Sequence, residues 1–396
     1  MLDNTSRKPP ALVIGFAIHG LAVARALARS GVEVHVLSEA ATPPPPTAHT
    51  RYARVYSRRG LNSELLPGIL AELMKDLGCE QKIVLFPTSD RIAKSIALAW
   101  PQLEEHCLLS WAHCRDQVLE LQRKDALAHY CERAGVRYPK SRNLAAAADC
   151  DALARELSFP VVVKPAQPLS AFKAIRVASL EELRQVVAKY PGELPFVVQE
   201  WIEGPEPSLY ACTAYLDRGR IVQLFTSRKL DASPRGLGQG TVFETLDCPE
   251  IIDITQRFLS VLDLSGPVAV EFKRDAAGAF WLIEPNVGRT EYCVDLAIQS
   301  GFNLPCIEYV HAIGRPQDMP APLPTRDRVW FDTDKDITCF VRNAARLRGQ
   351  RGGLRKPVFP YLGHDDWGPL AASLRQRARW AVRATGRRVL GALRPA

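Results

Sequence analysis

Residues 268–273 read Val-Ala-Val-Glu-Phe-Lys, and residues 281–286 read Trp-Leu-Ile-Glu-Pro-Asn. Each stretch is an apolar run interrupted by one glutamate, Glu271 or Glu284, and a short segment containing Asp and Gly joins the two. This pattern predicts two antiparallel strands of a hairpin. Because cross-strand neighbours lie side by side and residues two apart share a face, we expect Glu271, Glu284 and Asn286 on one surface.

The three side chains suggest a magnesium site. A carboxylate inside an apolar strand, such as Glu271, costs several kcal/mol if it is buried without a partner, which favours a compensating cation. Mg²⁺ prefers hard oxygen ligands and is usually held by one or two carboxylates together with phosphate oxygens. The alternative for Glu284 and Asn286 is an ordinary turn at the strand exit.

Two lysines precede this hairpin in the sequence. Lys164 ends the apolar run Phe-Pro-Val-Val-Val-Lys, and Lys124 stands in a helical region, 116–134, that ends at Gly135. A lysine supplies a point charge for phosphate oxygens. Lysines followed by strand carboxylates therefore predict a polyphosphate site with its magnesium, although a lysine at a strand end is more often simply solvated.

The N-terminal third alternates apolar runs with helical spacing and predicts a parallel α/β sheet. Gly15-Phe-Ala-Ile-His-Gly20 lies at the first strand-to-helix turn, where backbone N–H groups can hold a phosphate. Glu39 ends the second strand, about where a dinucleotide-binding fold keeps its ribose carboxylate. An NAD(P)-dependent oxidoreductase is therefore one open alternative; the other is that Gly15 serves only a tight turn.

The second half predicts antiparallel α+β structure. Residues 210–216 and 221–225 are apolar runs joined by a short turn, as are 268–273 and 280–283. Taken together, the residues quoted so far resemble the ATP-grasp superfamily, and the resemblance covers roughly residues 10–315. Two stretches resemble, more narrowly, carboxylate–amine ligases of bacterial polysaccharide gene sets: Pro87-Thr-Ser-Asp90 and Phe225-Thr-Ser-Arg-Lys-Leu230.

The resemblance implies a multidomain chain of α/β and α+β parts. After a disordered segment 1–10, it implies a Rossmann-like, pre-ATP-grasp open sheet and then the ATP-grasp domain with its lid. A linker and a basic tail would follow. The expected bounds are 11–115 for the open sheet, 116–315 for the ATP-grasp domain, about 155–200 for the lid, and 316–396 for the linker and tail.

The resemblance also implies how ATP and Mg²⁺ are bound. Lys124 and Lys164 would hold the α- and β-phosphates, and Glu271, Glu284 and Asn286 would bind the metal. The loop after Lys164 lacks the family's glycines, so any contact with phosphate falls to two of its side chains, Ser170 and Lys173.

Residues 199–206 resemble the adenine hinge of D-alanine–D-alanine ligases. By that match the Glu200 carbonyl and the Ile202 N–H hold the adenine edge, with Trp201 as a wall of the pocket. Gln199 would lie near the adenine amino group, and Glu206 would bind the ribose hydroxyls.

The reaction implied is an ATP-dependent ligation of a small-molecule carboxylate to an amine, through an acyl phosphate, with an amide as product. Arg289 is expected to face the oxyanion of the second step. Ala269 stands where relatives in the D-alanine ligase branch carry an arginine that helps the acyl phosphate form, and either Arg289 or Arg228 with Lys229 could take over that role. A nucleotide-binding scaffold without catalysis is the third alternative.

Composition is that of an ordinary globular protein: 396 residues, of which 47% are hydrophobic and 24% charged. The ten cysteines form no Cys-x-x-Cys pair, which favours reduced thiols and a cytoplasmic location. No stretch approaches the roughly 20 apolar residues of a membrane-spanning helix. The first ten residues do not resemble a signal peptide.

The net charge of +8 is unevenly distributed. Residues 342–396 hold 13 Lys or Arg and two Asp, a net of +11, so residues 1–341 carry the difference, −3. This argues against a body that binds nucleic acid. Residues 370–393 predict an arginine-rich helix that we expect to contact an anionic membrane surface, such as the inner face of the membrane. A solvated or partner-bound tail is the alternative, and the oligomeric state is not predicted.

Overall fold

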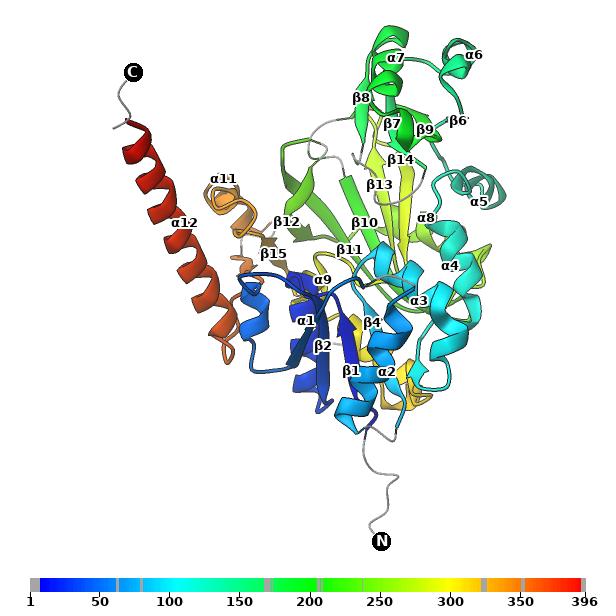
Figure 1. Ribbon diagram of the computed structural model, residues 1–396. Coiled ribbons are helices and arrows are strands. Elements are labelled where there is room, and N and C mark those ends of the chain that lie inside the picture. Colours follow the sequence, from blue (N-terminus) through cyan, green and yellow to red (C-terminus); the bar gives the residue numbers. More distant parts are fainter. Residues whose placement is uncertain are drawn as a thin grey trace.

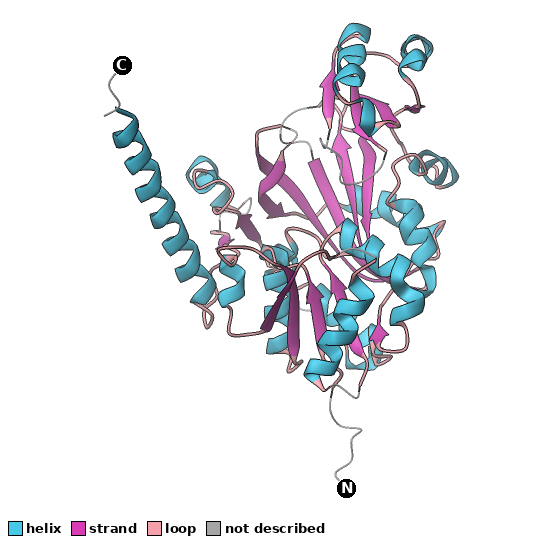
Figure 2. Ribbon diagram, viewed as in Figure 1, coloured by secondary structure: helices cyan, strands magenta, loops and turns pink. Residues whose placement is uncertain are grey.

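The computed structural model describes most of the chain, with residues 381–392 described by their backbone alone; the described ranges are 8–61, 64–78, 81–166, 172, 174–204, 207, 209–236, 238–321, 326–349 and 353–392. Three sheets of five, seven and four strands organise these residues. In Figure 1 the five-stranded sheet lies at the bottom, the seven-stranded sheet in the middle and the four-stranded sheet at the top. Figure 2 shows how helices flank each sheet.

The five-stranded sheet is parallel, in the order β3-β2-β1-β4-β5, which confirms the predicted open sheet. Its third strand, β3, was missed because its sequence, Arg-Val-Tyr-Ser-Arg, is no apolar run and none of its residues is fully buried. The elements are β1 (Ala11–Ile14), α1 (Ile18–Arg29), β2 (Val34–Glu39), β3 (Arg54–Arg58), α2 (Leu66–Leu77), β4 (Ile83–Pro87), α3 (Asp90–Leu103) and β5 (Cys107–Leu108).

Two short helices follow, α4 (Arg115–Leu121) and α5 (Leu127–Arg133). The prediction of one continuous helical region was therefore wrong, since residues 122–126 form a turn in which Arg123 pairs with Asp125 at 2.8 Å. Lys124 stands in that turn. Gly135 has a φ of +61°, which agrees with a left-handed end after α5.

The four-stranded sheet is antiparallel, in the order β6-β9-β7-β8, and two helices pack on it around Phe196 and Val198. It begins at Ser141, earlier than the predicted lid, because β6 pairs with β9 from Phe196 to Gln199. The elements are β6 (Ser141–Leu144), α6 (Cys150–Glu156), β7 (Val161–Pro165), β8 (Ile175–Val177), α7 (Leu180–Lys189) and β9 (Phe196–Glu200).

The seven-stranded sheet has the order β14-β13-β10-β11-β12-β15-β16 and contains both predicted hairpins. Its elements up to the last hairpin are β10 (Leu209–Asp217), β11 (Arg220–Ser233), β12 (Gln239–Thr245), α8 (Pro249–Ser260), β13 (Gly266–Arg274) and β14 (Phe280–Val287).

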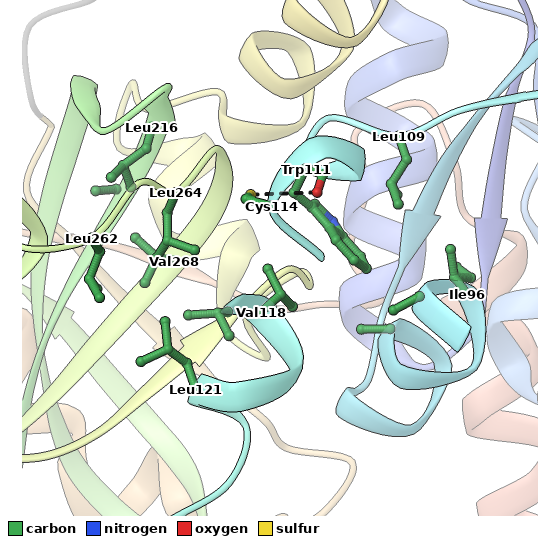
Figure 3. Close-up of a cluster of buried hydrophobic side chains, with 14 of the residues drawn as sticks. Ile96, Leu109, Trp111, Cys114, Val118, Leu121, Leu216, Leu262, Leu264 and Val268 are labelled. Atoms are coloured by element: carbon green, nitrogen blue, oxygen red, sulfur yellow. Dashed lines mark hydrogen bonds between the residues drawn. The ribbon is translucent and has the colours of Figure 1, made fainter. Parts of the chain in front are cut away.

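One hydrophobic cluster joins this sheet to the N-terminal sheet. Figure 3 shows Trp111, which is fully buried, between Leu109 and Ile96 on one side and Leu264 and Val268 on the other. The five-stranded and seven-stranded sheets therefore share one core, and together they can support a site between them.

The C-terminal quarter is largely folded onto the body. Residues 328–331 form a strand that pairs with β12, so the predicted linker and tail were wrong for this stretch. Its elements, after α9 (Val294–Gln299) and α10 (Leu304–Ala312), are β15 (Arg328–Phe331), α11 (Cys339–Asn343), β16 (Lys356–Val358) and α12 (Gly368–Ala392).

Helix α12 confirms the helix predicted near the C-terminus. It starts against the turn at Pro46–His49 and then leaves the body, as Figure 1 shows. Among the residues described, no helix has both the length and the apolar character needed to cross a membrane.

Candidate active site

The hairpin of β13 and β14 brings Glu271, Glu284 and Asn286 together. Glu271 lies directly opposite Glu284 in the strand register, and Asn286 Nδ2 donates a hydrogen bond to Glu271 Oε1 at 3.0 Å. No group of three His, Cys, Asp or Glu side chains that could hold a metal exists among the described residues. Two carboxylates and an amide oxygen therefore suit Mg²⁺ only if phosphate oxygens complete its ligand sphere, which is its usual mode of binding.

Lys164 lies near the end of β7, and its Nζ donates to Gln199 Oε1 at 3.0 Å. Gln199 is 3% exposed and in turn donates through Nε2 to Ser141 Oγ, also at 3.0 Å. The amide is thereby oriented with its oxygen toward the lysine. Lys164 and Gln199 are thus held next to one another on the two central strands of the four-stranded sheet.

A cavity of about 140 Å³ joins these lysine and carboxylate groups to the predicted adenine hinge. It lies between the four-stranded sheet and the seven-stranded sheet. Among the side chains that line it are Lys124, Lys164, Gln199, Glu200, Trp201, Ile202, Lys229, Glu271, Lys273 and Glu284.

The hinge is positioned by backbone bonds at the end of β9. The Glu200 N–H donates to Lys140 O at 2.9 Å, and the Trp201 N–H donates to Pro160 O at 3.0 Å. The Trp201 ring lies under Lys273, whose Nζ is 3.8 Å from the ring centroid. Lys273 is a site residue that the sequence interpretation missed, and its signal was its position two residues after Glu271, on the same face.

Three of the predicted nucleotide-binding residues, Ser170, Lys173 and Glu206, lie outside the described residues.

Arg228 and Lys229 are adjacent on β11, so their side chains leave opposite faces of the sheet. Lys229 lines the 140 Å³ cavity. Arg228 instead donates through Nε to Glu244 Oε1 at 2.7 Å and stacks over the Tyr210 ring. The structure therefore places Arg228 away from the site, which removes the geometric basis for its predicted catalytic role.

A second cavity, of about 510 Å³, opens on the other side of the carboxylates and shares Lys124, Glu271 and Glu284 with the first. Most of its remaining wall comes from the N-terminal domain, from the turn between α4 and α5, and from the segment after β14. That wall includes His19, Thr88, Ser89, Asp90, Gln122, Arg289, Glu291 and Tyr292.

Arg289 connects the N-terminal part of the chain to strand β14. Its Nε donates to Asp90 Oδ1 at 2.6 Å and its Nη2 donates to Asn286 Oδ1 at 2.5 Å. Burial disfavours the charged guanidinium, but the carboxylates of Asp90 and Glu291 outweigh that effect and raise the pKa of Arg289 above its ordinary value. A permanently charged group thus stands next to the predicted metal ligands.

His19 lies in the first turn of α1. Its Nε2 is 2.7 Å from Thr88 O, and because a carbonyl oxygen only accepts, Nε2 carries the proton. Burial lowers the pKa of His19 to about 4, with Arg289 acting in the same direction and the bond to Thr88 opposing. The ring is therefore neutral near pH 7.

The residues expected of a dinucleotide site serve the fold instead. Gly15 has a φ of +94°, and a Cβ there would lie 2.1 Å from Thr88 Oγ1, so close approach of the turn to β4 requires the glycine. Glu39 accepts hydrogen bonds from the N–H groups of Gly60 and Leu61 at 2.9 and 3.3 Å. Its carboxylate is thereby engaged with its own chain.

Comparison with known proteins identifies the fold. No protein-family model matches the chain. Part of it, 40%, is 30% identical over 174 residues to the D-alanine–D-alanine ligase of Ectopseudomonas mendocina (strain ymp), covering 53% of that enzyme. The ligase of Pseudomonas putida (strain GB-1) is 29% identical over 183 residues, with 40% of this chain and 52% of that enzyme covered. The chain thus spans about half the length of the curated relatives it matches.

Solved structures match over a larger share. The biotin carboxylase domain of Hydrogenobacter thermophilus 2-oxoglutarate carboxylase, solved with MgADP and bicarbonate, has a TM-score of 0.66 at 15% identity and covers 81% of this chain and 73% of its own. N5-carboxyaminoimidazole synthetase from Staphylococcus aureus has a TM-score of 0.64 at 15% identity, with 87% and 88% covered. An L-amino acid ligase from Bacillus licheniformis has a TM-score of 0.58 at 16% identity, with 81% and 76% covered. The chain therefore has the ATP-grasp fold, as these solved structures do.

Proposed function

We propose that the protein is an ATP-dependent carboxylate–amine ligase that forms an amide bond through an acyl phosphate. The observation that carries this proposal is the position of Glu271 and Glu284, which are shared by two cavities. One cavity leads to the hinge after β9, and the other leads to the N-terminal sheet. A nucleotide and a second substrate can thus meet at the same carboxylates.

The smaller cavity fits Mg-ATP by the chemistry of its side chains. Lys124 and Lys164 would hold the phosphates, and Lys229, on the opposite wall, adds a third positive charge. Glu271, Glu284 and Asn286 would bind magnesium together with phosphate oxygens. When bound, ATP supplies the phosphoryl group that activates the substrate carboxylate.

The larger cavity would take the carboxylate and the amine. Arg289 is held rigidly by Asp90 and Asn286, so its charge is positioned before any substrate arrives. A preorganised charge next to the reacting carbonyl stabilises the oxyanion that develops when the amine attacks. The relatives named above as D-alanine–D-alanine ligases and as an L-amino acid ligase support a small amino acid or a similar molecule as substrate.

The direct test is release of ADP by the purified protein with Mg-ATP and a panel of carboxylates and amines. A productive pair should stimulate ADP release, and Glu284→Gln should lower apparent magnesium affinity by at least about 10- to 100-fold, the loss typical even of an outer-shell partner. Glu181→Gln, on the exposed first turn of α7, is the matched control. Unchanged turnover in Glu284→Gln would exclude the metal assignment.

Ligand-induced thermal stabilisation separates the remaining alternatives. Mg-ATP should raise the melting temperature, whereas NADH and NADPH should not, because a ligand stabilises only the state that binds it. The reverse ranking would favour the oxidoreductase. Stabilisation by ATP together with no ADP release from any pair would favour a scaffold without catalysis.

We also propose that α12 contacts an anionic membrane surface. Its first turns are held to the body, where Ser373 Oγ is 3.1 Å from Asp334 Oδ1 and Gln376 Nε2 donates to Pro44 O at 2.8 Å. Further along, Trp380 is 74% exposed, and no acidic residue follows Asp366 in the sequence. Arginines with an exposed tryptophan are typical of helices at the membrane interface.

Co-sedimentation with phosphatidylglycerol vesicles tests this surface. The full chain should bind, and binding should fall as salt is added. A chain lacking residues 381–396 retains the Ser373 and Gln376 contacts and should bind clearly less. Equal binding of both chains, or equal binding to neutral phosphatidylcholine vesicles, would contradict the proposal.

A further inference from the structure

Three side chains on the wall of the 510 Å³ cavity have buried polar atoms with no hydrogen-bond partner among the described residues. They are His19 through Nδ1, Glu291 through Oε2, and Gln122 through both amide atoms. A buried polar atom without a partner costs free energy, so native proteins rarely leave several in one place. Their concentration around a single cavity points to a ligand that forms the missing hydrogen bonds.

Two of these atoms, Nδ1 of His19 and Oε2 of Glu291, are both hydrogen-bond acceptors. Because Nε2 of His19 carries the proton that it donates to Thr88 O, Nδ1 of the neutral ring has a free lone pair. Glu291 Oε2 is a carboxylate oxygen, which also accepts. Both residues adjoin Tyr292, whose ring centroid is 5.5 Å from that of His19.

Arg289, the nearest charged donor of the chain, makes no hydrogen bond to Glu291. Its Nη1 forms an ion pair with Glu291 Oε2 at 3.6 Å, which is longer than a hydrogen bond. That guanidinium directs its N–H groups to Asp90, Asn286 and Thr290 O instead. The missing partner of both acceptors is therefore an external group that carries N–H or O–H donors.

We propose that His19 and Glu291 bind the amino group of the amine substrate, and so place that substrate at the N-terminal end of the larger cavity. A primary amine or ammonium offers two or three N–H donors from one atom, whereas a carboxylate or phosphate offers none and would be repelled by Glu291. This assignment rests on the proposed ligase reaction. It leaves the phosphate and metal end of the cavity, at Lys124, Glu271 and Glu284, to the activated carboxylate.

Nuclear magnetic resonance of the full chain labelled with ¹⁵N-histidine tests the binding without any turnover. Methylammonium should shift the Nδ1 resonance of His19, which is identified by its absence in His19→Phe. Tetramethylammonium has the same charge but no N–H and should leave that resonance unmoved. No shift with methylammonium, or equal shifts with both ions, would overturn the proposal.

Steady-state kinetics then separates this proposal from the ligase assignment. With a productive substrate pair, Glu291→Gln should raise the KM for the amine by about tenfold to a hundredfold, the range expected for a hydrogen bond to a charged group. The affinity for Mg-ATP and the KM for the carboxylate should stay within about twofold. His364→Gln, at a side chain that is 81% exposed, is the control.

An unchanged amine KM in an active ligase would overturn the role of His19 and Glu291 alone. Failure of every substrate pair would count against the ligase assignment. The methylammonium titration would still decide whether His19 and Glu291 bind an amine. Thermal unfolding of each variant shows that it is folded before either measurement.

Discussion

At the scale of single residues, the site depends on the shape of the Arg289 side chain as well as on its charge. Arg289 reaches Asp90 and Asn286 with two different nitrogens of one planar group. A lysine has a single nitrogen on a flexible stem and would not hold both in a fixed relative position, as a planar guanidinium does. The arginine therefore fixes the N-terminal sheet relative to the β13–β14 hairpin as well as supplying a charge.

Glu308, on α10, is a buried carboxyl group outside the site, and it predicts a pH dependence of stability. It is 2% exposed, its Oε1 accepts from Ser110 Oγ at 2.8 Å, and burial raises its pKa from 4.5 to about 8. Below pH 4.5 the group is protonated in both the folded and the unfolded state. As the pH rises toward 8, the unfolded state loses its proton while the folded state keeps it, so the free energy of unfolding falls.

Glu308→Gln cannot ionise and should not show this fall. Urea unfolding of both proteins between about pH 5 and pH 8 should give curves that diverge by a few kcal/mol, since one pKa unit corresponds to about 1.4 kcal/mol. Parallel curves would show that the carboxyl group ionises in the folded protein without penalty.

At the scale of elements, the proposed nucleotide-binding hinge is positioned by its contact with the β13–β14 hairpin. A Cβ on Gly204 would lie 2.1 Å from the backbone oxygen of Arg274, and Ala276 N–H donates to Glu203 O at 3.0 Å. The strand alternation of β13 then brings Lys273 and Glu271 to the same face as the hinge. The cavity therefore depends on how closely two unconnected segments approach.

Gly204→Ala should push the hinge away from β13 and weaken Mg-ATP binding by about tenfold, or about 1.4 kcal/mol. Gly192→Ala is the control, because a Cβ there meets nothing within 4 Å. Isothermal titration calorimetry with a non-hydrolysable ATP analogue measures the difference. Equal affinities in the two variants would show that this contact does not position the hinge.

At the scale of the whole molecule, the C-terminal segment is tied to the first helix by a buried ion pair. Arg25 and Asp366 are 5% and 2% exposed, and Arg25 Nε donates to Asp366 Oδ2 at 2.9 Å. Asp366 also accepts from Thr50 Oγ1 at 2.6 Å and from the Arg51 N–H at 3.0 Å. Residues more than 300 positions apart thus share one polar cluster.

Asp366→Ala should destabilise the protein by about 3–5 kcal/mol, because it leaves Arg25 buried without its countercharge. Asp253→Ala removes one partner of an exposed pair on α8 and should cost no more than about 0.5 kcal/mol. Chemical denaturation of the two variants tests the contrast. Similar losses in both would show that the C-terminal segment contributes little to stability.

The sequence predicts those parts of the site that depend on residues close together along the chain. Glu271, Glu284 and Asn286 were predictable, because strand alternation and a short turn place them together locally. The same alternation predicts that Arg228 and Lys229 point to opposite faces of the sheet. It does not predict which of the two faces the cavity. The break between α4 and α5 carries no helix-breaking residue, and so the pattern predicted one helix where there are two.

The sequence by itself determined the ATP-grasp fold, through motifs spread over roughly residues 10–315. It also determined the hairpin of carboxylates and the basic C-terminal helix, since each of these is encoded in residues close together along the chain. The tertiary structure alone decided three further features: that residues 328–331 extend the central sheet, that Glu39 is engaged by Gly60 and Leu61, and that His19 and Glu291 face one cavity with unpartnered acceptors. The physical reason is that each of these depends on contacts between distant segments, whose hydrogen bonds and burial no local periodicity records.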